Sequence, residues 1–171
     1  MEPLTAIGID PGSLRTGWGV VRLDSEGFHL VDCGIIRTTS AGDTPFNERL
    51  GTIFRELSAV LERDRPQEAG IEAVFQAKNA SSALKLGQAR GVAVAACANR
   101  GIPVSDYAPS AIKQALTGTG RAEKEQVAFM VRHLLGTPRA EWPLDTSDAL
   151  GVAITHLTTR RAQLRMRSQG S

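Results

Sequence analysis

The chain has 171 residues, of which 42% are hydrophobic and 22% are charged, and its formal net charge at pH 7 is +2. These values are typical of one globular domain and exclude a disordered or fibrous chain. No apolar run reaches the roughly 18 residues of a membrane span, and no cationic segment precedes an apolar one at the N-terminus. Cys33 and Cys97 lie far apart without neighbouring histidines, which argues against a structural zinc site. We therefore expect a cytoplasmic protein without a membrane segment.

The small net charge conceals an uneven distribution along the sequence. Residues 73–122 carry six basic side chains and one acid, and residues 156–171 carry four arginines and no acid. The total of +2 leaves −7 for the rest of the chain. Nucleic-acid enzymes show this segregation, because cations hold the polyanion while phosphoryl chemistry uses carboxylates that bind metal ions.

In chain order, apolar alternation and turn residues predict strands over 4–9, 17–23 and 28–38, with a hairpin loop at 24–27. Apolar residues at three- and four-residue spacing then predict a helix from Thr44 to the residue before Pro66. A strand over 69–74, a helix over 79–99, a strand over 102–107 and helices over 109–116 and 123–135 follow. The last helix is predicted to begin near Asp145, with an Asp or Thr as its cap.

This order of elements predicts an α/β fold with a mixed five-stranded sheet flanked by helices, in which three antiparallel strands are followed by parallel strands. Right-handed crossovers place the fourth strand beside the first. We assign residues 1–159 to this one domain and residues 160–171 to a basic C-terminal tail with a flexible end.

Four acidic residues become candidates for one site in this topology. Asp10 ends the first strand and Glu72 lies near the end of the fourth, so both reach the sheet edge where open α/β folds bind ligands. Asp145 and Asp148 are three residues apart at the start of the last helix and share a face. Converging carboxylates need cations, and a ligand set made only of oxygens favours Mg²⁺ or Mn²⁺.

The residues alone leave a structural interpretation open for each acid. Asp10 in the sequence DPG is also typical of a turn, Asp145 of a helix cap, and Asp148 of a side chain that complements the helix dipole. Glu72 is harder to explain in this way, because a glutamate within the apolar segment IEAVF needs a buried partner or a function.

Four segments resemble, in order and spacing, the motifs of the RuvC family of crossover junction endodeoxyribonucleases. They are GIDPGSLRTGWGV, IEAVFQAKNASSALKLGQARGVAVAA, AIKQALTGTGRAEKEQV and LDTSDALGVAITH, and the likeness extends to about Leu157. The resemblance implies an RNase H-like fold and a homodimer that resolves Holliday junctions by paired symmetric nicks. It places this nuclease in DNA recombination and repair, after RuvA and RuvB have driven branch migration. The basic tail lies outside the resemblance.

The resemblance also implies roles for individual residues. The family's catalytic acids fall on Asp10, Glu72, Asp145 and Asp148. These acids would hold two Mg²⁺ ions, with Mn²⁺ as an alternative, for hydrolysis to 5′-phosphate and 3′-hydroxyl ends. Lys124 matches a lysine near the scissile phosphate and is the fifth catalytic candidate.

Further candidates are expected to contact the DNA. The family has an aromatic residue at the position of Phe75 that intrudes among bases at the crossover, and a lysine at the position of Lys113 that contacts the backbone. Weaker candidates for phosphate contacts are Lys78, Lys85, Arg90 and Arg121. From the residues alone, Phe75 is equally a core residue, and the basic side chains are equally a solvated surface.

Three alternatives compete with the nuclease. The first segment also resembles the first phosphate loop of the sugar kinase, Hsp70 and actin group, which predicts a nucleotide-binding phosphotransferase. That group needs a second phosphate loop and a second domain, for which 171 residues are too few. A noncatalytic junction-binding protein would not need all four acids. An RNase H-like nuclease acting on RNA would lack the segment KNASSALKLGQARG.

Overall fold

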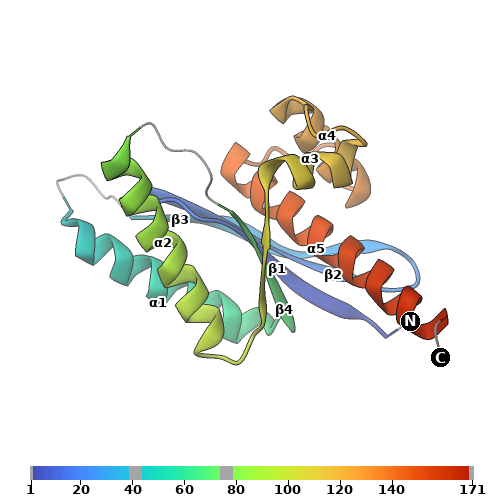
Figure 1. Ribbon diagram of the computed structural model, residues 1–171, viewed down its shortest axis with the longest axis horizontal. Coiled ribbons are helices and arrows are strands. Elements are labelled where there is room, and N and C mark those ends of the chain that lie inside the picture. The colour runs from blue at the N-terminus through green and yellow to red at the C-terminus, as the bar shows by residue number, and fades with distance from the viewer. Residues whose placement is uncertain (1, 39–43, 74–78, 170–171) are drawn as a thin grey trace.

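The computed structural model describes residues 2–38, 44–73 and 79–169. Strands and helices follow one another in this part of the chain as predicted, with helices on both sides of a sheet (Figure 1). The elements are β1 (Leu4–Asp10), β2 (Arg15–Leu23), β3 (Phe28–Arg37), α1 (Phe46–Asp64), β4 (Glu68–Glu72), α2 (Ala80–Ala98), β5 (Val104–Tyr107), α3 (Pro109–Thr117), α4 (Lys124–Leu134) and α5 (Leu144–Gln169).

The five strands form one sheet in the order β3-β2-β1-β4-β5. β1, β2 and β3 pair antiparallel, whereas β4 pairs parallel with both β1 and β5. Asp24 and Gly27 close the hairpin between β2 and β3, where the Asp24 N–H donates to the Gly27 carbonyl over 3.1 Å. The predicted mixed sheet, with the first and fourth strands adjacent, is confirmed.

Alternate residues of the central strands face different helix layers, as the period of two in a strand requires. Ile7, Ile9 and Ile71 belong to the core beneath α1 and α2. Ala6 and Val21 belong to the core on the opposite face, which α5 covers together with α3 and α4. Figure 1 shows α5 lying along this second face, with α3 and α4 near its N-terminal end. Every second residue of these strands therefore belongs to a row that faces α5.

Several element boundaries differ from the predictions: β2 begins at Arg15, β5 begins at Val104, and α1 begins at Phe46 with Pro45 and not Thr44 as its N-cap. Two further differences affect the sheet face beneath α5. β4 begins at Glu68, one residue earlier than predicted, so its face towards α5 carries a glutamate at each end. α5 begins at Leu144, and the N–H groups of Thr146 and Ser147 donate to the Pro143 carbonyl. Asp145 therefore lies inside the first helical turn and is not the cap.

α5 continues without a break past Thr159 to Gln169. Arg160 donates from Nε to both carboxylate oxygens of Glu68, at 2.9 and 2.7 Å, so the first residue of the predicted tail is fixed to the sheet. The flexible end of that tail stays a prediction. Among residues 2–38, 44–73 and 79–169, no helix combines the length and the hydropathy that crossing a bilayer demands.

Candidate active site

Asp10 and Glu72 lie side by side at the ends of neighbouring parallel strands. Ile9 of β1 pairs with Ile71 of β4, and the next residue of each strand is the acid. The two carboxyl groups share a side-chain hydrogen bond. The sheet thus brings together two acids that are distant in sequence, as the strand order predicted.

The first turn of α5 lies over the same end of the sheet. Asp10 pairs across β1 and β2 with Gly17, and the Asp145 backbone lies so close above Gly17 that an added Cβ there would be 2.0 Å from the Asp145 carbonyl oxygen. One turn further along the helix, Asp148 accepts a hydrogen bond from Lys124 Nζ at 3.0 Å. Lys124 begins α4, and the charges of Asp145, Asp148 and Lys124 act on the strand acids.

Negative charge is concentrated at this point. Burial raises the pKa of Asp10 to about 8, and the charges of Glu72, Asp148 and Asp145 contribute to the increase. Burial also raises the pKa of Glu72, against the hydrogen bond with Asp10 and the nearby cations. A carboxyl group that keeps its proton near neutral pH marks a site where a bound cation would relieve repulsion.

The donor set suits a hard divalent cation, because all four side chains offer carboxylate oxygens. Within the described residues, however, no group of three or more His, Cys, Asp or Glu side chains is already arranged to hold a metal ion. Asp148 is paired with Lys124 over 3.0 Å, and Asp10 shares a hydrogen bond with Glu72. The chemistry of the four side chains fits a divalent cation, although their present arrangement does not yet form its ligand set.

A cavity of about 640 Å³ opens beside Asp10 and Glu72. Its other walls come from the chain after β1 and β4, from α2 and α3, and from the loop after α3: Pro11, Ala73, Leu86, Ala108, Pro109, Ser110, Lys113 and Gly120. Lys113 is half-buried there, and its charge lowers the pKa of Glu72. The cavity therefore has two carboxyl groups and a lysine ammonium group on its walls.

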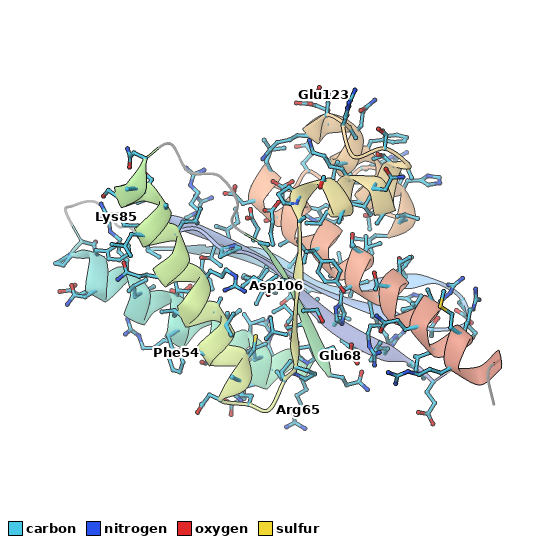
Figure 2. All side chains as sticks on the ribbon, viewed as in Figure 1. Phe54, Arg65, Glu68, Lys85, Asp106 and Glu123 are labelled. Atoms are coloured by element: carbon cyan, nitrogen blue, oxygen red, sulfur yellow. The ribbon has the colours of Figure 1, made fainter. Side chains whose placement is uncertain are left out.

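The remaining basic candidates lie elsewhere or outside the described residues. Lys85, labelled in Figure 2 on α2, has its Nζ 5.9 Å from the centre of the Phe46 ring. Arg90 forms an ion pair with Asp106 of β5. Arg121 is exposed in the loop before α4. Phe75 and Lys78 fall outside the described residues, and DNA contacts by all five residues stay predictions: Phe75, Lys78, Lys85, Arg90 and Arg121.

A second polar cluster, at the other end of β4, was not predicted. His156 of α5 is only 1% exposed, with Nε2 2.7 Å from Glu68 and Nδ1 3.0 Å from the Tyr107 hydroxyl. Burial lowers the pKa of His156. Burial alone would raise the pKa of Glu68, but hydrogen bonds from Arg160 and His156 lower it overall. The available signal was the segment EAGIE, whose two glutamates share one face of a strand.

Comparisons with known sequences all lead to one family. The family model for the crossover junction endodeoxyribonuclease RuvC matches residues 6–156, a range that includes all four acids. The RuvC of Nitratidesulfovibrio vulgaris is 58% identical over 158 residues, which cover 92% of this chain and 93% of the relative. The RuvC of Lawsonia intracellularis is 53% identical over 162 residues, with 95% of each chain covered.

Solved structures agree as well. Thermus thermophilus RuvC superimposes with a TM-score of 0.85 at 37% identity, over 94% of this chain and 97% of that chain. The T. thermophilus RuvC in complex with a Holliday junction substrate gives a TM-score of 0.86 at 37% identity, over 94% and 96%. These matches favour the nuclease resemblance over the phosphotransferase alternative. With its RNase H-like fold and its four acids inside the matched range, the chain belongs to the RuvC family of crossover junction endodeoxyribonucleases.

Proposed function

We propose that this chain is a metal-dependent endonuclease that resolves Holliday junctions by paired symmetric nicks. The observation that carries the proposal is the cluster of Asp10, Glu72, Asp145 and Asp148 beside an open cavity, where the pKa of Asp10 is raised to about 8. The T. thermophilus relative has been solved with a Holliday junction substrate, which supports the same substrate for this chain.

The four acids are the residues that would hold the metal, which we propose to be two Mg²⁺ ions, with Mn²⁺ as an alternative. Such a pair would lower the pKa of a bound water and stabilise the leaving 3′ oxygen, leaving 5′-phosphate and 3′-hydroxyl ends. Asp10 ends the central strand β1, between β4 with Glu72 and β2 beneath Asp145, so it would be the ligand common to both sides of the site. Asp145 and Asp148 would complete the ligand sets from α5.

Lys113 and Lys124 supply the positive charge that the acids lack. Lys113 lines the cavity, and Lys124 donates to Asp148 over 3.0 Å. The hydrogen bond to Asp148, together with the charge on that carboxylate, raises the pKa of Lys124. In the proposed site, both lysines attract the phosphate and stabilise the negative charge that develops on it during hydrolysis.

Two copies of the chain would match the approximate two-fold symmetry of a four-way junction, so we propose a homodimer with one site per strand cut. The RuvA and RuvB partners and the cytoplasmic location are carried by the resemblance and the composition, and they stay predictions.

The deciding experiment uses a synthetic four-way junction with purified protein and Mg²⁺ or Mn²⁺. We expect symmetric nicks from the wild type and a loss of about 1000-fold in rate from Asp10→Asn, with junction binding retained. An Asp10→Asn variant that cleaves at the wild-type rate would refute the assignment of the site. Wild-type binding without cleavage under either metal would support the noncatalytic alternative.

A further inference from the structure

The face of β1 and β2 that lies beneath the N-terminal half of α5 carries almost no side chains. Two successive pairs of the β1–β2 ladder face the helix: Gly8 opposite Gly19, and Asp10 opposite Gly17. Three of these four positions are glycine, and the fourth is the catalytic candidate Asp10. We call Gly8, Gly17 and Gly19 the glycine platform.

Side chains on this platform would collide with α5. A Cβ at Gly8 would lie 2.0 Å from the Ala149 carbonyl oxygen, and a Cβ at Gly19 would lie 2.5 Å from Cδ2 of Leu150. Both distances are well below van der Waals contact, so these glycines allow the helix to rest directly on the strand backbones. The contact at Gly19 meets the fully buried Leu150, whose Cγ and Cα would lie 2.7 and 3.3 Å from the added Cβ, so an alanine there disturbs core packing and does not meet a candidate ligand.

The contact at Gly17 differs, because it meets a candidate metal ligand. A Cβ at Gly17 would lie 2.0 Å from the carbonyl oxygen, 2.6 Å from the carbonyl carbon and 3.3 Å from Cβ of Asp145. The backbone of Asp145 cannot rotate away without moving the first turn of α5. Since Gly17 pairs with Asp10, the same position fixes the height of Asp145 above Asp10.

We propose that Gly17 is a positioning residue for the reaction, one that holds the Asp145 carboxylate at working distance from the Asp10 carboxylate. This inference rests on the proposed function. A methyl group at position 17 must push the helix start outward by about 1 Å to reach van der Waals contact. When a catalytic group is misplaced by about 1 Å, the reaction rate typically falls by about 100-fold. Gly19, two residues along on the same face, has no such role.

The test compares Gly17→Ala with the matched control Gly19→Ala, each as the full-length protein. We expect single-turnover junction cleavage to fall about 100-fold in Gly17→Ala and to stay near the wild-type rate in Gly19→Ala. Mn²⁺ binding, measured by calorimetry without DNA, should weaken about tenfold in Gly17→Ala alone. Junction affinity in Ca²⁺ should be unchanged in both variants.

A second substitution separates positioning from general damage. Asp145→Glu adds one methylene, so it should slow the wild type but partly restore cleavage in the Gly17→Ala background, where the helix has moved outward. Such a change of sign measures coupling between the two positions. Equal loss in both backgrounds would overturn the positioning role. A Gly17→Ala protein that does not fold, even with trimethylamine N-oxide present, would also overturn it, since the contact would then be structural.

The outcome can be separated from a failure of the proposed function by including Asp145→Asn. If Asp145→Asn cleaves like the wild type, the assignment of the site is wrong. If Asp145→Asn is inactive while Gly17→Ala and Gly19→Ala cleave at equal rates, the site stands and only the role of Gly17 is refuted.

Discussion

Glu68 and Glu72 occupy opposite ends of β4, four residues apart on the same face, yet their surroundings are opposite in charge. Glu68 accepts hydrogen bonds from Arg160 and His156, and these lower its pKa against the effect of burial. Glu72 lies beside Asp10, and burial together with the charge on Asp148 raises its pKa. The end with cations stabilises the fold, whereas the end with acids stores repulsion that a metal ion would relieve.

One helix produces this difference. α5 runs along β4 with Asp148 near its first turn and with His156 and Arg160 two to three turns later. Acids near the positive N-terminal end of a helix are the arrangement that its dipole favours. Figure 2 shows Glu68 far from Glu123, the residue that precedes Lys124 at the site. The two ends of β4 can therefore be changed independently.

Replacing each glutamate separately by glutamine should give the largest effects: one variant should lose activity and the other should lose stability. Glu72→Gln should lower junction cleavage about 1000-fold and leave the free energy of unfolding unchanged or higher, because a repelled charge is removed. Glu68→Gln should leave cleavage near the wild-type rate and lower the free energy of unfolding by about 2 kcal/mol, because charged hydrogen bonds are lost. Single-turnover assays and urea unfolding measure the two quantities.

The division of roles between Glu68 and Glu72 is refuted if either variant behaves like the other. A Glu68→Gln protein of normal stability would mean that the contacts with His156 and Arg160 contribute nothing. A Glu72→Gln protein that is strongly destabilised and still active would make Glu72 a structural residue.

Divalent cations should stabilise the protein only through the end of β4 that carries Glu72. Mg²⁺ at ten times its Kd should raise the stability of the wild type by about 1.4 kcal/mol, or roughly 3–6 °C in Tm, since it binds the folded site. Glu68→Gln should keep the full increase, and Asp10→Asn should lose it. Thermal unfolding with and without Mg²⁺, with K⁺ at matched ionic strength as the control, measures the effect. An equal increase in Asp10→Asn would place the bound cation elsewhere.

Acid should weaken the contacts at the other end of β4, where Glu68 meets His156. The pKa of His156 is lowered from about 6.5, so its neutral form stabilises the fold above that value, and this contribution is lost as the pH falls through the folded pKa. The lowered pKa of Glu68 has the same sign: its contribution is present above its ordinary value near 4.5 and is lost below it. The raised pKa values of Asp10 and Glu72 act in the opposite sense, because the folded state takes up protons there as the pH falls. The contribution of His156 is therefore measured as a difference: from pH 6.5 downward, the free energy of unfolding in urea should decline in the wild type relative to a variant without the imidazole.

His156→Gln provides the control for that decline. A neutral glutamine keeps hydrogen-bonding capacity but cannot take up a proton between pH 6.5 and 5. The part of the pH dependence that His156 causes in this interval should therefore be absent from the variant, although the variant itself is less stable. If the wild type and His156→Gln lose stability in parallel, another group is responsible.

Sequence patterns were sufficient to predict the sheet and the neighbouring positions of Asp10 and Glu72, because right-handed crossovers fix the strand order. They could not predict that Asp145 lies against Gly17. That contact depends on how closely α5 approaches the sheet, which is set by the side-chain volume between them. Glu68 was missed for a different reason: a five-residue strand has ends that local patterns place to within a few residues only.

The smallest effect should come from the exposed pair of Arg90 and Asp106, which extends the comparison to the surface. Asp106 is 54% exposed, so water screens its attraction to Arg90, and Arg90→Ala should lower the free energy of unfolding by only about 0.5 kcal/mol. If Arg90 contacts a DNA phosphate as predicted, the same variant should reduce the salt dependence of junction binding by about one counterion. Asp106→Asn is the matched control, because it frees Arg90 and should tighten binding at low salt. Unchanged salt dependence in both variants would limit Arg90 to its surface ion pair, in contrast to the partly buried Arg160 that holds Glu68.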